Sequence, residues 1–243
     1  MSVTKFVPAP SEYAAIFEAE RLRSYPAIDA FEARCGYAID RVKLETAARV
    51  LACPLKINPP NWQHGRVIYA ATRRALAACD EQAVCLLDIG TAKGFSALCL
   101  EWARLDSGAV GVVHSVDVID PASHTHRNTA AECDGPKTLA EILEPWPEAQ
   151  AIAFYHDTGI DWLRRHKGRV HVAFVDGKHS SDVVREEGRL IASRQKTGDV
   201  AIFDDVQIDS VRLATLALET EDSWDFECIG PKRDRMYAIG VCR

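Results

Sequence analysis

Five short apolar runs between Val84 and Asp205 constrain the fold more than any other feature of the chain. The runs are VCLLDI, VGVVHSVDV, AIAFY, VHVAFVD and VAIFDD, and each is separated from the next by a loop or helical segment. Parallel strands need such crossover segments between them. The runs are continuously apolar, which indicates a sheet whose two faces are both covered by helices. The pattern therefore predicts an α/β fold.

The C-terminal segment changes to a different pattern. Apolar residues alternate with acidic ones from Trp224 to Cys228, and residues 230–234 separate them from a second apolar run, MYAIGV. Two short runs joined by a connection that contains glycine and proline predict an antiparallel hairpin. We therefore expect a Rossmann-like, mostly parallel seven-stranded sheet that ends in a C-terminal antiparallel hairpin.

The N-terminal part is expected to be helical. Residues 11–57 show helical patterning, most clearly from Asp40 to Leu51, before the sequence Asn-Pro-Pro-Asn at 58–61 interrupts it. A further helix from His64 to Cys79 carries an apolar face that should cover the first strand. We therefore divide the chain into an N-terminal helical cap region, 1–60, and a ligand-binding domain, 61–243.

Composition excludes several classes of partner. The chain has 243 residues, of which 35 are acidic and 29 basic, and its net charge of −6 is spread without a polybasic block. Nucleic acids and anionic membranes are therefore not expected as partners. The start of the chain lacks the apolar core of a signal peptide, and no stretch approaches the roughly 18 apolar residues of a spanning helix. These features predict a cytoplasmic protein. The eight cysteines form no C-x-x-C pair and are interpreted as structural thiols.

The segment LLDIGTAKGFSALCLEWARL, residues 86–105, predicts a ligand-binding turn. A buried strand ends near Asp88, Gly90 and Gly94 lie in the turn, and an amphipathic helix follows. Glycines let the backbone approach a ligand closely, and the helix N-terminus favours an anionic group. The alternative is a plain strand-turn-helix in which the glycines serve packing only.

A dinucleotide would use the same architecture but fits this turn poorly. The fingerprint G-x-G-x-x-G, aligned on Gly90, places Ala92 and Phe95 at the second and third glycines, where small residues are needed. Asp117 ends the second strand and can accept both hydroxyls of a ribose. Asp117 would suit either kind of cofactor, so Phe95 is the feature that argues against a dinucleotide, and nicotinamide binding is kept as the last alternative.

Carboxylates end two further strands. Asp176 follows the run VHVAFV, and Asp204 with Asp205 follows VAIF, so all three should meet at the carboxyl edge of the sheet. Oxygen ligands favour a hard divalent cation such as Mg²⁺. The alternative is that Asp176 and Asp205 cap the helices that follow. His179 lies three residues after Asp176 and has an ordinary pKa suited to a general base, although it could also be a surface histidine.

The sequence from Asp88 to Ser96, DIGTAKGFS, resembles the first motif of metal-dependent small-molecule O-methyltransferases, the group that includes catechol and caffeoyl-CoA methyltransferases and antibiotic-pathway relatives. The resemblance covers about residues 60–243, and neither residues 1–57 nor 120–147 take part in it. It implies S-adenosylmethionine as the cofactor. The implied cofactor contacts are His64, Gly65, Asp88, Gly90, Thr91, Gly94, Ser96, Asp117, Asp157 and Asp176.

The resemblance also implies how the reaction proceeds. Asp176, Asp204 and Asp205 would hold the metal, although relatives often have Asn at the third position, and His179 would take the proton of an acceptor hydroxyl. A small-molecule hydroxyl acceptor is therefore expected. The alternatives are a metal-independent methyltransferase acting on nitrogen or a carboxylate, and an inactive S-adenosylmethionine-binding module. A second metal at His124 and His126, and a homo-oligomer, stay open.

Overall fold

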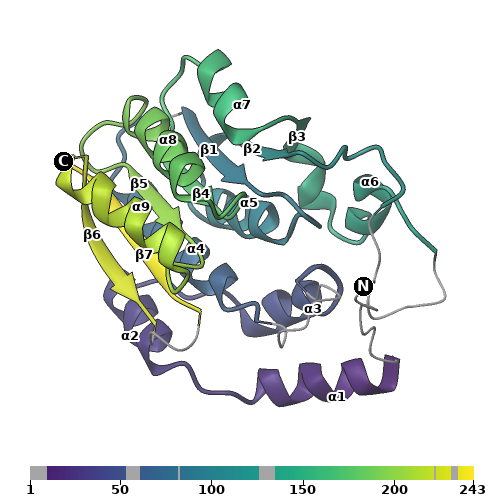
Figure 1. Cartoon of the computed structure of the whole chain (residues 1–243). Helices are drawn as coiled ribbons and strands as arrows, with labels where there is room; N and C mark the ends of the chain where they lie inside the picture. The colour runs from purple at the N-terminus through teal and green to yellow at the C-terminus, as the bar shows by residue number, and fades with distance from the viewer. Residues whose placement is uncertain (1–9, 53–60, 82, 126–134, 222, 231–234) are drawn as a thin grey trace, which may run out of the picture.

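A single seven-stranded sheet forms the centre of the molecule (Figure 1). The computed structural model describes residues 10–52, 61–81, 83–125, 135–221, 223–230 and 235–243. The strands lie side by side in the order β3-β2-β1-β4-β5-β7-β6. Their bounds are Ala83–Ile89 (β1), Val110–Asp117 (β2), Ala153–His156 (β3), Val172–Val175 (β4), Val200–Phe203 (β5), Trp224–Ile229 (β6) and Tyr237–Cys242 (β7).

The strand directions confirm the predicted fold class. The strands β1 to β5 pair in parallel, whereas β7 lies antiparallel between β5 and β6. The chain moves outward from β1 through β2 to β3 and then returns to form β4 on the other side of β1. In open α/β sheets, ligands bind beyond the carboxyl ends of the strands at such a reversal. The end of β1 beside β4 is therefore where a site is expected.

Helices cover both faces of this sheet, as the continuous apolar runs predict. One face carries α4 (His64–Ala77) and α5 (Phe95–Asp106), and the other carries α7 (Gly159–Arg165), α8 (Ser181–Ala192) and α9 (Asp209–Thr220). Successive strand residues enter the two cores in turn: Leu86 lies in the first and Leu87 in the second, both fully buried. None of the described helices is long and apolar enough to cross a bilayer.

The connection between β2 and β3 contains two short helical pieces. They are α6, Leu139–Leu143, and a single 3₁₀ turn, η1, Pro147–Ala151. Thr138 caps α6, because its hydroxyl accepts the Glu141 amide while the Glu141 carboxylate accepts the Thr138 amide. These two helical pieces lie near the edge strand β3 (Figure 1), and residues 126–134 of the same connection lie outside the described residues.

Within residues 10–52, which the structure describes, the N-terminal helical region contains three separate helices. These are α1 (Pro10–Arg21), α2 (Pro26–Cys35) and α3 (Arg41–Leu51). The predicted helix from Asp40 to Leu51 is present, with Asp40 outside it as the N-cap that accepts the Lys43 amide at 2.8 Å. The proline pair at 59 and 60, which marks the predicted boundary, lies outside the described residues.

Several contacts fasten these cap helices to the rest of the fold, and two of them involve the segment that starts α4. The guanidinium of Arg66 on α4 is buried and donates to the carboxylates of Glu32 and Asp29 on α2. The rings of Phe17 on α1 and Trp62, just before α4, stack with their centroids 4.5 Å apart. Breaking a buried ion pair leaves an uncompensated charge, so the cap is held firmly to the start of α4.

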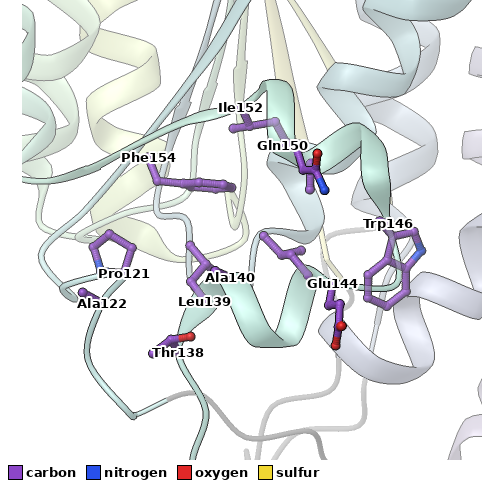
Figure 2. Close-up of a pocket in the computed structure, with 12 residues that line it drawn as sticks. Pro121, Ala122, Thr138, Leu139, Ala140, Glu144, Trp146, Gln150, Ile152 and Phe154 are labelled. Atoms are coloured by element: carbon purple, nitrogen blue, oxygen red, sulfur yellow. The ribbon is translucent and has the colours of Figure 1, made fainter.

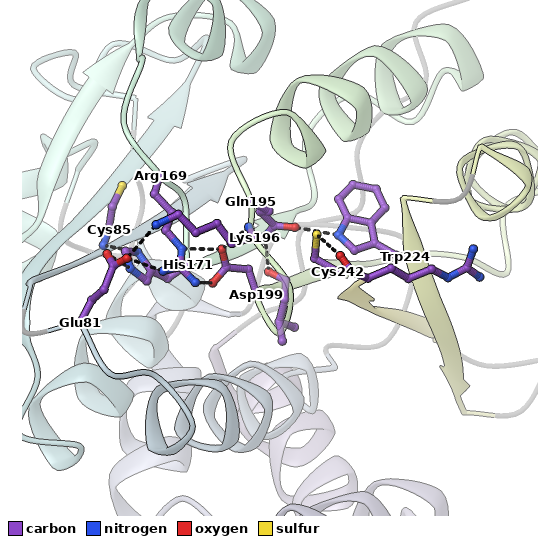
Figure 3. A network of polar contacts seen from close by, with 11 residues as sticks. Glu81, Cys85, Arg169, His171, Gln195, Lys196, Asp199, Trp224 and Cys242 are labelled. Atoms are coloured by element: carbon purple, nitrogen blue, oxygen red, sulfur yellow. Dashed lines mark hydrogen bonds and ion pairs between the residues drawn. The ribbon is translucent and has the colours of Figure 1, made fainter.

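A polar network closes the opposite edge of the sheet, at the amino ends of the strands (Figure 3). Arg169 donates two hydrogen bonds, of 2.7 and 2.8 Å, to the carboxylate of Asp199. Glu81 accepts hydrogen bonds from Arg169 and Lys196, and it lies 3.2 Å from His171. These contacts lower the pKa of Glu81 to about 2. The network ties the ends of β1, β4 and β5 together away from the predicted site.

Glu187 is a buried acid on the covered face of α8. Its side chain packs against the first turn of α7: an oxygen lies 2.5 Å from the position that a Cβ on Gly159 would take. The other carboxylate oxygen has no hydrogen-bond partner among the described residues. Burial raises the pKa of Glu187 to about 7. The charged form is therefore costly in the folded state.

We predict that Glu187 makes the fold less stable as pH rises. The folded pKa of about 7 exceeds the ordinary value of 4.5, so the folded state holds its proton more tightly between these pH values. Stability is then lost from about pH 4.5 upward and levels off above pH 7. Glu187→Gln should raise the free energy of unfolding by about 3 kcal/mol at pH 8 and little at pH 4. Urea denaturation measures this, with Glu219→Gln, which changes an exposed acid on α9, as control. Equal effects at both pH values would contradict it.

Candidate active site at the carboxyl edge of the sheet

The glycine turn brings the ends of β1 and β4 into direct contact. Gly90 has a φ of 102°, and a Cβ at this position would collide with the carbonyl oxygen of Asp176. Gly94 has a φ of 82° and stands at the N-cap of α5. Both positions therefore require glycine. The close approach places the predicted cofactor turn beside the predicted metal edge.

Asp88 supports the turn from inside the protein. It has no exposed surface, and its carboxylate accepts a 2.5 Å hydrogen bond from the hydroxyl of Ser115. The hydroxyl of Ser115 in turn lies 2.7 Å from that of Thr91. Burial raises the pKa of Asp88 to about 7, although the bond from Ser115 opposes this rise. Thr91 and Ser96 are also buried, so these residues shape the turn from behind.

Asp117 lines a narrow groove in front of the turn. Its carboxylate accepts the backbone amides of Ala92 at 2.8 Å and Ile119 at 2.9 Å. The amide of Asp157 donates to the Asp117 carbonyl, and the Asp157 carboxylate pairs with Arg165. The structure thus brings Asp117 and Asp157 together. The groove is lined by Thr91, Ala92, Asp117, Ile119, Pro121, Leu139, Phe154 and Tyr155.

The groove continues into a larger apolar cavity of about 690 Å³ at the β3 edge (Figure 2). Pro121, Leu139 and Phe154 line both spaces, and Trp146 and Ile152 extend the cavity wall. Its polar lining consists of Thr138, Glu144 and Gln150. Among the described residues, no histidine or aspartate lines this cavity, so its described lining offers mainly apolar binding surface.

His64 and Gly65 begin α4 but differ in surroundings. The His64 ring lies between Phe95, at a centroid distance of 5.0 Å, and Phe174, at 6.1 Å. The charge of His64 helps to lower the pKa of Asp176. His64 therefore lies near the end of β4. A Cβ on Gly65 would crowd the side chains of Leu44, Cys99 and Phe95. Gly65 therefore serves the packing of α4 on α5.

The three predicted metal-binding carboxylates meet around one guanidinium, that of Arg235. Arg235 donates to both oxygens of Asp204 and, at 3.2 Å, to Asp176, and its Nε lies 3.7 Å from Asp205. Neither Asp176 nor Asp205 caps a helix, because α8 and α9 begin after Ser180 and Ile208. The helix-cap alternative is therefore wrong. Asp205 has a φ of 55°, an unusual backbone conformation that sharply bends the end of β5.

His179 lies on the other side of the same carboxylates. Its Nε2 is 3.2 Å from Oδ1 of Asp176 and 3.7 Å from Oδ2 of Asp205. The hydrogen bond with Asp176 raises the pKa of His179. Burial opposes ionisation of Asp176, but the bond from His179 and the charge of Arg235 outweigh it and lower its pKa. Within the part of the chain that the structure describes, Asp176, His179 and Asp205 form the one group with the spacing of metal ligands.

Two further positions complete the comparison with the predicted residues. His124 lies 3.9 Å from Glu141 on the surface, and His126 lies outside the described residues. Arg235 was not predicted, although it follows a basic stretch in the hairpin connection. Basic residues between the two predicted hairpin strands could have indicated that a positive charge lies near the carboxyl ends of the parallel strands.

Known proteins share this domain and this fold. Residues 87–206 match a family model described as a methyltransferase domain, whereas no curated protein matches the chain. A candidate O-methyltransferase from Klebsiella pneumoniae has 13% identity and a TM-score of 0.55, with 96% of each chain covered. The methyltransferase PaMTH1 of Podospora anserina, bound to S-adenosylhomocysteine, has 11% identity and a TM-score of 0.53, with 98% of each chain covered.

A third structure shows that the fold alone does not name the acceptor. An rRNA methylase from Streptococcus thermophilus has 11% identity and a TM-score of 0.50, with 70% of this chain and 93% of that chain covered. At such identities the likeness establishes the common fold, and the matched domain establishes the chemistry. The chain is an S-adenosylmethionine-dependent methyltransferase with the class I methyltransferase fold.

Proposed function

We propose that this methyltransferase acts on a hydroxyl group of a small molecule with the assistance of a divalent metal ion. The observation that carries the proposal is the meeting of Asp176, Asp204 and Asp205 around a cation, with His179 beside them. This cluster adjoins the glycine turn, because the backbones of Gly90 and Asp176 touch. A methyl donor and a hydroxyl acceptor can therefore be held side by side.

The cofactor site extends from the turn to the groove. S-adenosylmethionine supplies the methyl group. The backbone amides at the start of α5, after Gly94, favour its carboxylate, and Asp117 is placed to accept its ribose hydroxyls. His64 and Asp157 would flank it, whereas Asp88, Thr91, Ser96 and Gly65 would act by shaping the turn and its support.

The carboxylate cluster fits a divalent cation. It already surrounds the positive charge of Arg235, and its donor atoms are carboxylate oxygens of the kind that Mg²⁺ prefers. Asp176, Asp204 and Asp205 would hold the ion, which supplies Lewis acidity that lowers the pKa of an acceptor hydroxyl.

His179 would receive the acceptor proton. Its Nε2 faces Asp176, so the neutral ring that donates Nε2–H to this carboxylate leaves Nδ1 as the basic nitrogen. Asp176 fixes the ring orientation. The side chain is one-third exposed, so a bound acceptor can reach it.

The charge of the site argues against a nucleic-acid acceptor. The edge carries three carboxylates, and the whole chain has a net charge of −6. Both would repel a phosphate backbone. A metal-independent transfer to nitrogen or to a carboxylate would leave the cluster with Arg235 alone. Dependence of turnover on the metal separates the two proposals.

We predict that S-adenosylhomocysteine raises the melting temperature and that NAD does not, because Phe95 occupies a dinucleotide glycine position. Asp117→Ala should weaken S-adenosylhomocysteine binding by about 10-fold or more, since hydrogen bonds to a charged group are lost. Calorimetric titration measures the change. Asp225→Ala, an exposed acid on β6, is the control. If Asp117→Ala bound S-adenosylhomocysteine as tightly as the wild type, Asp117 would not be the residue that binds the ribose hydroxyls.

We expect chelator to abolish turnover and Mg²⁺ or Mn²⁺ to restore it. Screening against hydroxylated small molecules, with product detected by mass, provides the assay. Cofactor affinity should change by less than about threefold, because the residues assigned to the cofactor and to the metal differ except for Asp176. Full turnover in excess chelator would favour the metal-independent alternative.

His179→Ala should lower kcat by about 10²-fold or more and leave S-adenosylmethionine affinity nearly unchanged. General bases contribute roughly 10² to 10⁴ and act only in the transition state. The matched control is His124→Ala, whose exposed imidazole lies beside Glu141 of α6. Steady-state kinetics and a binding titration measure the two quantities. An unchanged kcat would show that His179 is not the base.

A further inference from the structure

Arg235 holds a central position that the proposed reaction does not use. It precedes β7, at the end of the connection from β6, and its side chain is only 20% exposed. Besides the three carboxylates, its guanidinium donates to the backbone carbonyl of Asn61 at 3.0 Å. One arginine thus joins the hairpin, the strand edge and the segment that leads into α4.

Two of the carboxylates divide their oxygens between Arg235 and His179. Asp176 turns Oδ1 to His179 and Oδ2 to Arg235, and Asp205 turns Oδ2 to His179 and Oδ1 toward Arg235. Asp204 is fully buried and gives both oxygens to Arg235. An ion that binds all three carboxylates must therefore take oxygens that now contact Arg235.

Like charges cannot share this position. A guanidinium and a divalent ion within a few ångströms of each other repel strongly in a partly buried site. The same three carboxylates cannot serve both cations in full. A metal ion bound by Asp176, Asp204 and Asp205 together would therefore require Arg235 to leave its present contacts with them.

A cavity beside Arg235 can receive its side chain. The cavity is about 450 Å³ and is lined by the cap segment Arg23–Ile28 and by Asn61, Gly230, Arg235 and Tyr237. The hydroxyl of Tyr237 is buried and has no hydrogen-bond partner among the described residues. It is an acceptor available to a displaced guanidinium.

We propose that Arg235 is an internal counter-ion that occupies the position of the divalent metal and must leave the carboxylates before the metal can bind. This inference rests on the metal site proposed above. It makes Arg235 the residue that sets metal affinity: the carboxylates are held together and neutralised without metal, and the ion binds only by displacing the arginine.

Titration of the full chain with Mn²⁺ alone, without cofactor or acceptor, tests the proposal. Arg235→Gln removes the competing charge and should bind Mn²⁺ tighter than the wild type, on the order of tenfold or more. Arg185→Gln, which removes an arginine paired with Glu221 on the far side of α8, is the matched control and should bind as the wild type does. An unchanged or weaker Mn²⁺ affinity in Arg235→Gln overturns the proposal.

A second measurement needs only the wild type. Crystals grown with and without Mn²⁺ should show the guanidinium away from Asp176 and Asp205 when the ion is bound. Mn²⁺ bound on the His179 side, with Arg235 still on all three carboxylates, overturns the proposal. Because neither measurement uses turnover, chelator-resistant activity would remove the proposed metal assistance and leave the role of Arg235 to be decided by these results.

Discussion

The close approach of Gly90 to Asp176 is the constraint on which the rest of the site depends. Any side chain at position 90 would collide with the carbonyl of Asp176, so the ends of β1 and β4 could not lie as they do. The turn proposed to bind the cofactor and the edge that carries the carboxylates are thereby held at a fixed separation. Methyl transfer depends on such positioning more than on any single reactive group.

Charge is the second constraint. Three carboxylates at one edge of a sheet would repel one another without a cation, and Arg235 supplies one from the hairpin. The antiparallel strands β6 and β7 therefore do more than extend the sheet. They return the chain to the carboxyl edge and deliver a positive charge there, which the parallel strands alone do not provide.

The sequence predicted the elements whose pattern is local. Apolar runs marked all five parallel strands, and alternation marked β6, because each pattern reflects burial of that segment's own residues. It could place Asp176 and Asp205 at one edge because parallel strands share their direction. It could not place Arg235, whose partners lie 31 and 59 residues away along the chain. Nor could it show that Gly65 serves helix packing, since this depends on Leu44 and Cys99 in other helices.

The attachment of the cap through Arg66 has a consequence for any attempt to rebuild this enzyme from parts. Glu32 and Asp29 on α2 neutralise an arginine that belongs to α4, two residues after His64. A cap taken from another protein would leave that arginine buried without its partners unless the contact face of α4 were exchanged with it. The unit that can be exchanged is therefore the cap together with the first turns of α4, and a boundary drawn near residue 60 would cut through it.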